Sequence, residues 1–367
     1  MSLDPTKFEI YAVGGYVRDR LLGRDPKDHD YVVVGATAED MINAGFEPIE
    51  ASFPVFLHPV SRDEYALARK ERKVGVGYHG FEVFFDPTVT IEDDLYRRDL
   101  TVNAMARRVI GWSSEGFAKL SDEIVDPFNG QQDLKDGMLR HVSEAFAEDP
   151  VRVLRTARFS ARYGFDVHPD TVTLMGKVAP ELNHIPQERI WAEFEKGLME
   201  QFPWLMFELL EQCGAMTTTS LVPYAGANTG VMTQFVDDTP LHARFVIAAR
   251  QFMPEDYDTC RIPTELARVS KAFNTNVCML WAYDEFEAPE RLTALEAMRA
   301  INDDTLLVKC VDALMLFHEM RDMISNVMLM GRDLKRIRSV DAAAIAATCK
   351  NGLEIKQKLF EARVAAM

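Results

Sequence analysis

The sequence has few cysteines and no long apolar run, and each shortage excludes a class of protein. Its five cysteines are widely separated in the second half of the chain, at Cys213, Cys260, Cys278, Cys310 and Cys349. An odd, dispersed set provides neither a disulfide framework nor a zinc site, so we expect reduced thiols that are mostly buried. No apolar segment approaches the about 18 uninterrupted residues of a membrane span.

Positive charge is also in short supply. The chain has 41 Lys and Arg residues against 57 Asp and Glu residues, which gives a net charge of −16. A surface with this balance repels a polyanion at long range, so a nucleic-acid partner requires a local basic stripe. The N-terminus, MSLDPTKFEI, lacks the charged and then apolar pattern of a secretory signal, which predicts a cytoplasmic protein with no membrane partner.

Apolar residues make up 47% of the 367 residues, enough for two or three domains of about 100–200 residues each. The first 142 residues have a mixed pattern of strands and helices. Short β-rich runs predict buried strands at residues 8–13, 31–34, 55–57 and 65–68. A helix is expected over 17–22, and the charged, glycine-rich segment 69–80 predicts a mobile basic loop.

From about residue 143 the pattern becomes helical. Asp149 is a candidate N-cap followed by Pro150 at the first helical position, which predicts a helix over 151–162. A second helix is expected over 186–198, and residues 214–240 are rich in Thr, Gly and Asn, as domain boundaries often are. We therefore expect an α+β protein whose mixed-sheet head is followed by all-α domains. The expected domains are residues 1–142, 143–213 and 214–367.

The pattern Asp28-His29-Asp30 directly precedes a predicted strand. Residues i and i+2 of a strand point to one face, so the two carboxylates lie together. Two hard oxygen ligands on one face suit Mg²⁺, which takes its remaining ligands from water and substrate phosphates. Taken alone, the pattern fits a solvated loop better than a metal site.

The Gly14-Gly15 pair upstream favours the metal interpretation. Two glycines between a strand and a helix let the backbone approach a phosphate closely, and the N-terminus of the helix attracts the anion. Arg18, in the first turn of that helix, can add a charge-assisted contact. The plainer interpretation of the glycines is a tight turn.

A stripe of arginines follows in the helix expected over 151–162, at Arg152, Arg155, Arg158 and Arg162. Spacings of three and four place them on one helix face, and no carboxylate lies between the first and the last. Because a solvated helix usually interleaves opposite charges, the stripe is predicted to face an anion. A second basic cluster fits RNA phosphates and a solvated face equally well, at Arg332, Lys335, Arg336 and Arg338.

Together these motifs resemble the signature of class II tRNA nucleotidyltransferases, the CCA-adding enzymes, in their bacterial branch. The blocks that carry the resemblance follow one another in the order of that family, at residues 14–23, 28–30, 64–69, 97–104, 126–130 and 148–155. The bacterial poly(A) polymerases share the first blocks and stay as an alternative.

The resemblance implies a DNA-polymerase-β-like nucleotidyltransferase head, a helical neck with a nucleotide-selecting helix, and a helical body and tail that bind tRNA. It implies that Asp28 and Asp30 are the catalytic and metal-binding residues. It assigns nucleotide contacts to Gly15, Arg18, Arg98, Asp149, Arg152 and Arg155. It gives supporting roles to Gly14, Glu64, Asp99, Asn103 and Arg158. For Asp99 this is a contact with the ribose, and the plainer interpretation is an ion pair with Arg97 or Arg98.

The implied activity is addition of the 3′-terminal CCA to tRNA without a template, from CTP and ATP, with two Mg²⁺ ions and release of pyrophosphate. No obligate protein partner is implied. An enzyme that adds only CC or only A, and a non-enzymatic RNA-binding protein, remain as further alternatives. Only His242 and His318 follow residue 200, so no histidine-rich phosphohydrolase domain is expected.

Asp149 and Arg152 are expected to select the incoming base. Cytosine and adenine both present an amine donor beside a ring-nitrogen acceptor, and an ionised Asp accepts where an Arg donates. Uracil and guanine present the inverse arrangement, so they are mispaired in the same pocket. The plainer interpretation of Asp149 is an N-cap alone, which stabilises a helix by about 1 kcal/mol.

Overall fold

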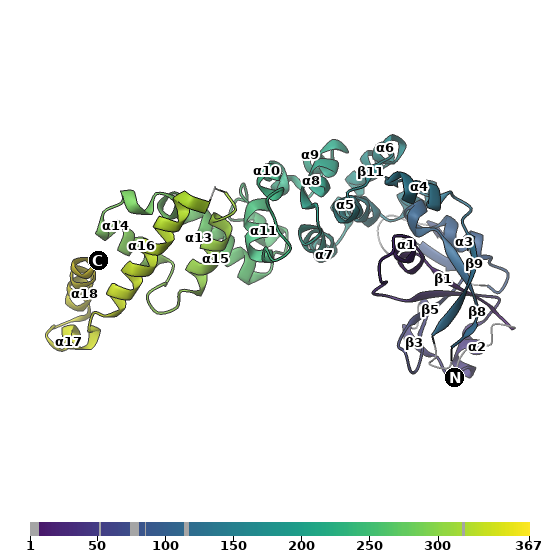
Figure 1. Cartoon of the computed structure of the whole chain (residues 1–367), viewed down its shortest axis with the longest axis horizontal. Helices are drawn as coiled ribbons and strands as arrows, with labels where there is room; N and C mark the ends of the chain where they lie inside the picture. The colour runs from purple at the N-terminus through teal and green to yellow at the C-terminus, as the bar shows by residue number, and fades with distance from the viewer. Residues whose placement is uncertain (1–6, 51–52, 74–80, 85, 114–116, 318–319) are drawn as a thin grey trace. The chain divides into compact units, whose positions relative to one another are not determined.

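The computed structural model describes all residues except 1–6, 51–52, 74–80, 85, 114–116 and 318–319 (Figure 1). Its contacts group the chain into two compact units. The first unit comprises residues 1–197 and 205–220, and the second comprises residues 198–204 and 221–367. This boundary falls inside the Thr-, Gly- and Asn-rich segment, at Leu221 where residue 214 was expected. The head and neck limits at residues 142 and 213 stay predictions.

The first unit contains a seven-stranded mixed sheet in the order β3-β4-β5-β2-β1-β8-β9 (Figure 1). Its strands are β1 (Glu9–Val13), β2 (Asp30–Val34), β3 (Glu47–Glu50), β4 (Phe53–Leu57), β5 (Glu64–Leu67), β8 (Ala106–Trp112) and β9 (Ala118–Val125). Strand β1 is antiparallel to β2 and β8, whereas β2 is parallel to β5. The four strands expected from the sequence are confirmed.

The expected loop at residues 69–80 is wrong in its first part. Residues 70–73 form β6 (Lys70–Lys73), which pairs antiparallel with β7 (Phe81–Phe84). Residues 74–80 lie outside the described residues.

The central strands are covered on both faces. On one face Tyr31 stacks on Tyr65 with ring centroids 4.6 Å apart, and Phe46 meets the edge of Tyr65 at 4.8 Å. On the other face Val32 packs in a cluster with Leu95, which is fully buried. Burial on both faces explains why β2 reads as a continuous apolar run.

The helices of this unit are α1 (Gly15–Leu21), α2 (Ala38–Asn43), α3 (Ile91–Tyr96), α4 (Gly130–Asp136), α5 (Val151–Tyr163), α6 (Pro169–Val178), α7 (Gln187–Leu198), α8 (Pro203–Gln212) and α9 (Ala215–Thr218). Two short strands, β10 (Met138–Leu139) and β11 (Asp166–Val167), pair in parallel. Helices α5 and α7 confirm the two expected neck helices. Helix α5 begins at Val151 as expected, but Pro150 occupies the N-cap position that was expected for Asp149.

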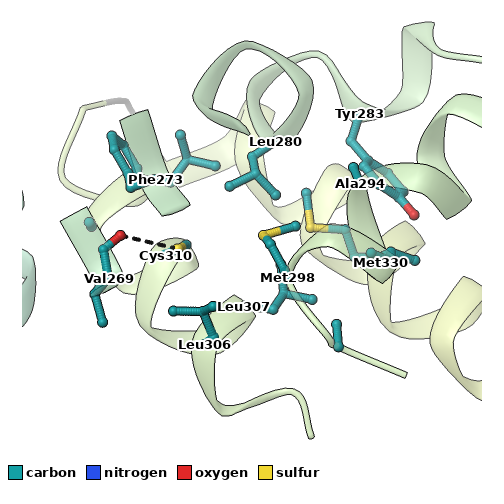
Figure 2. Close-up of a cluster of buried hydrophobic side chains, with 14 of the residues drawn as sticks. Val269, Phe273, Leu280, Tyr283, Ala294, Met298, Leu306, Leu307, Cys310 and Met330 are labelled. Atoms are coloured by element: carbon teal, nitrogen blue, oxygen red, sulfur yellow. Dashed lines mark hydrogen bonds between the residues drawn. The ribbon is translucent and has the colours of Figure 1, made fainter. Parts of the chain in front are cut away.

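The described residues of the second unit form helices and no strand. Its helices are α10 (Thr229–Met232), α11 (Leu241–Ala248), α12 (Asp256–Thr259), α13 (Thr264–Trp281), α14 (Ala288–Ala297), α15 (Thr305–Leu314), α16 (Met320–Arg338), α17 (Ala342–Ala347) and α18 (Gly352–Ala366). Figure 2 shows its core, in which Val269 and Phe273 of α13 face Leu307 and Cys310 of α15. The Cys310 thiol lies 3.9 Å from the Val269 carbonyl oxygen.

All five cysteines are free thiols, as expected. Cys213, Cys260 and Cys310 are buried, Cys349 is half-buried and Cys278 is exposed. Burial raises the pKa of Cys260 and of Cys310 to about 12, so these thiols stay protonated and inert. Within the described residues, no helix is long and apolar enough to cross a membrane.

Candidate active site

Carboxylates gather at one edge of the central sheet. Asp30 is the first residue of β2, and the parallel register places it opposite Glu64, the first residue of β5. Asp28 lies two residues before the strand and is exposed. Burial raises the pKa of Asp30, and the neighbouring charges of Glu64 and Asp28 raise it further, whereas Arg98 opposes them. The edge therefore concentrates negative charge that a cation would relieve.

These carboxylates do not form a complete metal cage. Across the described part of the chain, no group of three or more His, Cys, Asp or Glu side chains is arranged to hold a metal ion. An ion bound by Asp28 and Asp30 must therefore take its other ligands from water or from a substrate. That partial protein coordination is typical of Mg²⁺ at phosphate-transfer sites.

The Gly14-Gly15 turn reaches the same edge of the sheet, because β1 runs antiparallel to β2 and ends where β2 begins. Gly14 has a φ of +63°, and its amide donates to the Met105 carbonyl oxygen at 3.2 Å. A Cβ at Gly14 would lie 2.9 Å from Nη1 of Arg98. Two features therefore favour glycine at this position. The positive φ disfavours other residues, and a Cβ would collide with the Arg98 guanidinium.

Arg98 is held in this position by Asp94, a residue that the sequence analysis missed. Asp94 is fully buried, and one of its oxygens accepts from Nη2 of Arg98 at 3.0 Å. Its other oxygen accepts from Nη2 of Arg97 at 2.9 Å. Although burial alone would raise the pKa of Asp94, the two guanidinium groups keep it below its ordinary value. The spacings of three and four from Asp94 on α3 were the sequence signal for these pairs.

Asp99 is not the partner of Arg97 or Arg98, contrary to the plainer interpretation of the sequence. Its carboxylate accepts from Nη2 and Nε of Arg155 on α5 at 2.8 and 2.9 Å. It also accepts from Nδ2 of Asn103 at 3.0 Å. The nearby arginines are already neutralised by Asp94, which leaves Asp99 for α5. A ribose contact by Asp99 stays a prediction.

Arg18 is almost completely covered, with 4% of its surface exposed. Its Nε donates to Asp19 at 2.8 Å, and its Nη1 donates to Asn103. The guanidinium also lies over the rings of Phe159 and Tyr163 on α5, at 5.3 and 5.1 Å. Arg18 therefore links α1 to α5, and its predicted contact with a nucleotide stays a prediction.

The remaining arginines of the α5 stripe also contact groups of the protein itself. Nε of Arg158 donates to Glu193 of α7 at 2.7 Å, and Nη2 of Arg162 lies 3.7 Å from Asp19. Nη1 of Arg152 donates to the Ala145 carbonyl oxygen at 2.7 Å. Three of the four arginines of the stripe thus pair with carboxylates from other elements, and their contact with a substrate anion stays a prediction. Sequence spacing along α5 alone could not reveal those partners.

Asp149 lies at the start of α5 with about a third of its side chain exposed. Oδ1 accepts from the backbone amide of Val151 at 3.1 Å, so the carboxylate does satisfy one free amide of the helix. Oδ2 lies 3.7 Å from Nη2 of Arg189 on α7, another residue that the sequence analysis did not single out. Base selection by Asp149 and Arg152 stays a prediction.

The second basic cluster is largely occupied by other contacts. Nη2 of Arg338 donates to Asp304 at 3.0 Å and to the Ala300 carbonyl oxygen at 2.8 Å. Arg336 donates to the carbonyl oxygen of Met367. All four members of the cluster are exposed, and Arg336 and Arg338 are the two that make these contacts.

The chain is similar to known proteins over much of its length. A family described as the poly A polymerase head domain matches residues 10–140, and a probable RNA and SrmB-binding site of polymerase A matches residues 164–220. The Multifunctional CCA protein of Paraburkholderia phymatum is 52% identical over 246 residues, which are 65% of this chain and 57% of that protein. The protein of the same name from Dechloromonas aromatica is 53% identical over 247 residues. The chain is thus similar to Multifunctional CCA proteins over about two thirds of its length, and residues 10–140 match the poly A polymerase head family.

Solved structures of CCA-adding enzymes share the fold of the chain. The Bacillus stearothermophilus CCA-adding enzyme in complex with CTP covers 98% of this chain and 89% of its own, with a TM-score of 0.67 and 21% identity. A CCA-adding enzyme in complex with ATP covers 99% of this chain and 86% of its own, with a TM-score of 0.70 and 21% identity. The fold of a polymerase-β-like head followed by helices is thereby confirmed. The chain spans 57% of the length of the two curated relatives named above.

Proposed function

We propose that the chain adds the 3′-terminal CCA to tRNA without a nucleic-acid template, using CTP and ATP. The observation that carries this proposal is the convergence of Asp28 and Asp30, the Gly14-Gly15 turn and Arg98 at one sheet edge. The relatives named above as Multifunctional CCA proteins support the choice of tRNA. A cytoplasmic location accompanies the proposal, because that is where tRNA ends are completed.

The carboxylate edge fits Mg²⁺. Its donors are hard oxygens, and the raised pKa of Asp30 records burial together with repulsion from Glu64 and Asp28. Asp28 and Asp30 would hold the ion. When bound, Mg²⁺ lowers the pKa of the attacking hydroxyl and neutralises charge on the pyrophosphate leaving group.

In the proposed reaction the terminal 3′-hydroxyl of the RNA attacks the α-phosphorus of the nucleotide. A new P–O bond forms to the RNA, the bond to the β-phosphate oxygen breaks, and the hydroxyl proton passes to solvent. The backbone amide of Gly15 and the guanidinium of Arg98 would bind the triphosphate. Asp94 holds that guanidinium at the required position.

The bacterial poly(A) polymerases remain the second candidate, because the family that matches residues 10–140 is described as a poly A polymerase head. Incubation of a tRNA lacking its 3′ end with CTP, ATP or both, resolved at single nucleotides, separates the candidates. A CCA-adding enzyme adds two residues from CTP alone and stops after three from the mixture. Long ladders from ATP alone would identify a poly(A) polymerase, and no extension at all would refute both.

A further inference from the structure

The middle residue of the Asp28-His29-Asp30 motif points away from the two carboxylates that flank it. Side chains alternate between the two faces of an extended chain, so His29 shares a face with Tyr31 and not with Asp30. The contacts agree with this alternation. The ring centroid of Tyr16 lies 4.6 Å from that of His29 and 5.9 Å from that of Tyr31. His29 therefore lies behind the carboxylate pair.

From this position His29 contacts the sequence neighbours of the two other motifs that reach the same sheet edge. Tyr16, whose ring it meets, directly follows Gly15 on α1. Nδ1 of His29 also lies 3.5 Å from Oδ1 of Asp63, which directly precedes Glu64 at the start of β5. One imidazole thus joins the glycine turn, the carboxylate pair and the first residue of β5.

Both partners of His29 are themselves held in place. Tyr16 is 3% exposed, and its ring meets the edge of the Tyr31 ring. Oδ2 of Asp63 accepts from Oγ of Ser61 at 2.7 Å, which leaves Oδ1 toward His29. A side chain that contacts two fixed partners restricts the backbone that carries it.

That restriction matters because Asp28 lies outside the strand register. The pairing of β2 begins at Asp30 with β5 and at Tyr31 with β1. Asp28 is exposed, two residues before the strand. The described strand pairings therefore order Asp30, whereas the contacts of His29 order the backbone next to Asp28. Without them, ordering Asp28 beside Asp30 costs conformational entropy at the moment when an ion binds.

We propose that His29 is a positioning residue for the metal-binding carboxylates, whose contacts with Tyr16 and Asp63 hold Asp28 beside Asp30. This inference rests on the proposed nucleotidyl transfer. His29 is not itself a ligand, because it points away from the pair. Across the described part of the chain, no three His, Cys, Asp or Glu side chains are arranged to hold an ion. The ion instead meets two carboxylates that are already in place.

Loss of the imidazole is expected to weaken binding of the ion and to spare the step that follows. A bound ion orders both carboxylates by itself, so kcat at saturating Mg²⁺ stays close to that of the unaltered protein. The Mg²⁺ concentration for half-maximal CTP incorporation rises by roughly tenfold, the lower end of the loss when a group that supports metal ligands is removed. A merely structural role would lower the melting temperature and leave this concentration unchanged.

The test uses the full chain and Mn²⁺, which takes the same oxygen ligands and whose electron paramagnetic resonance signal reports binding without turnover. The binding component that Asp30→Asn removes defines the site. In His29→Ala, the dissociation constant of that component is expected to rise by roughly tenfold. His29→Arg is expected to retain most of the affinity, because a guanidinium stacks on Tyr16 and donates to Asp63 but cannot ligate a metal.

His168→Ala is the matched control. The side chain of His168 is 26% exposed, against 30% for His29, and its Nδ1 lies 3.6 Å from Oδ2 of Asp170. It caps the start of α6 and belongs to none of the elements at the carboxylate edge. Its loss should leave the Mn²⁺ affinity unchanged. His29→Ser provides a second variant without the imidazole should His29→Ala fold poorly.

Unchanged Mn²⁺ affinity in His29→Ala and His29→Ser, or an equal loss in His168→Ala, overturns the role of His29. An Arg variant that binds Mn²⁺ as weakly as the Ala variant overturns it too, because the two contacts are then not the cause. A lower melting temperature with unchanged affinity assigns His29 to the fold alone and likewise overturns the inference. Failure of the unaltered protein to incorporate CTP refutes the proposed function instead. The Mn²⁺ titration needs no turnover, so the two failures are distinguishable.

Discussion

At the scale of single residues, two buried carboxylates five positions apart hold arginines of different elements. Asp94 binds Arg97 and Arg98 within its own segment, whereas Asp99 binds Arg155 of α5. A buried carboxylate is costly unless it is both paired and hydrogen-bonded, and each of these is. The two acids therefore fix guanidinium groups at the sheet edge and at the neck helix.

Asp99 is expected to make the stability of the protein depend on pH. Burial alone would raise the pKa of Asp99, but Arg155 and Asn103 stabilise the ionised form, and the pKa lies below its ordinary value. Such a group stabilises the fold above its unfolded pKa of about 3.9, and the stabilisation is lost as pH falls toward the folded pKa. Urea unfolding between about pH 6 and pH 3 should show a steep loss below about pH 4.

Asp99→Asn is expected to lower the free energy of unfolding at neutral pH by about 1–3 kcal/mol and to flatten the loss in acid. The exposed Asp122→Asn should change neither the stability nor its slope against pH. An Asp99→Asn variant with the slope of the unaltered protein would contradict the assignment.

Loss of the Asp30 charge is expected to lower activity without lowering stability. Its pKa is raised by burial and by the charges of Glu64 and Asp28, so the ionised carboxylate opposes folding. Asp30→Asn should therefore melt at an equal or higher temperature. Nucleotide incorporation in Mg²⁺ should fall by at least about 10²-fold, the usual loss when a group that stabilises transition-state charge is removed. Full turnover by the variant would refute the metal assignment.

The sequence predicts Asp28 and Asp30 as a metal-binding pair because residues i and i+2 of a strand share one face, which is a local property of the chain. It does not identify Asp94 or Arg189 as partners, although Asp94 has helical spacing to Arg98. A carboxylate near several arginines has several candidate partners in sequence. Only the packing of α3 and α5 against the sheet decides that Asp94 takes Arg98 and Asp99 takes Arg155.

At the scale of elements, α4 shows a motif with a structural role. Asp126 accepts from the Gly130 amide at 2.7 Å and from the Gln131 amide at 2.9 Å, which satisfies two free amides at the start of α4. Asn129 adopts a left-handed conformation with φ of 59° to bring this about. The block Asp126–Gly130 thus joins the helix to the sheet and contributes no group to the candidate site.

Gly130 is expected to tolerate no side chain. A Cβ at this position would lie 2.2 Å from the backbone carbonyl oxygen of Thr101. Gly130→Ala should therefore reduce the free energy of unfolding by about 1–3 kcal/mol, as forced overpacking does. Gly111→Ala is the matched control, because a Cβ there meets nothing within 4 Å and should cost less than about 0.5 kcal/mol. Equal stability of the two variants in urea would contradict the close approach of α4.

At the scale of the whole molecule, the second unit contains a buried arginine with carbonyl partners. Arg244 is 3% exposed and donates to the Thr239, Leu198 and Val236 carbonyl oxygens at 2.9, 2.8 and 2.8 Å. Burial lowers its pKa from the ordinary value for arginine. The contact with Leu198 explains why residues 198–204 group with the second unit.

Two compact units with separate cores are expected to unfold in two calorimetric transitions. Arg244→Met keeps the apolar volume but leaves buried carbonyl oxygens without donors, which should destabilise the second unit by about 2–4 kcal/mol. Only one of the two transitions should shift. Arg268→Met removes an exposed ion pair with Glu265 and should shift neither by a measurable amount. Two transitions that shift equally in Arg244→Met would contradict the separate cores.

The sequence by itself determined the local elements of this protein and its resemblance to the CCA-adding enzymes. Short apolar runs, helix caps and the glycine turn each act over a few residues. Local sequence alone therefore predicts β1, β2, α5 and the Asp28-His29-Asp30 motif. The tertiary structure decided the partners. Arg155 meets Asp99 across 56 positions and Arg158 meets Glu193 across 35, distances over which sequence spacing carries no signal. Burial makes those long-range pairs specific, because a buried charge must find a partner wherever the fold brings one.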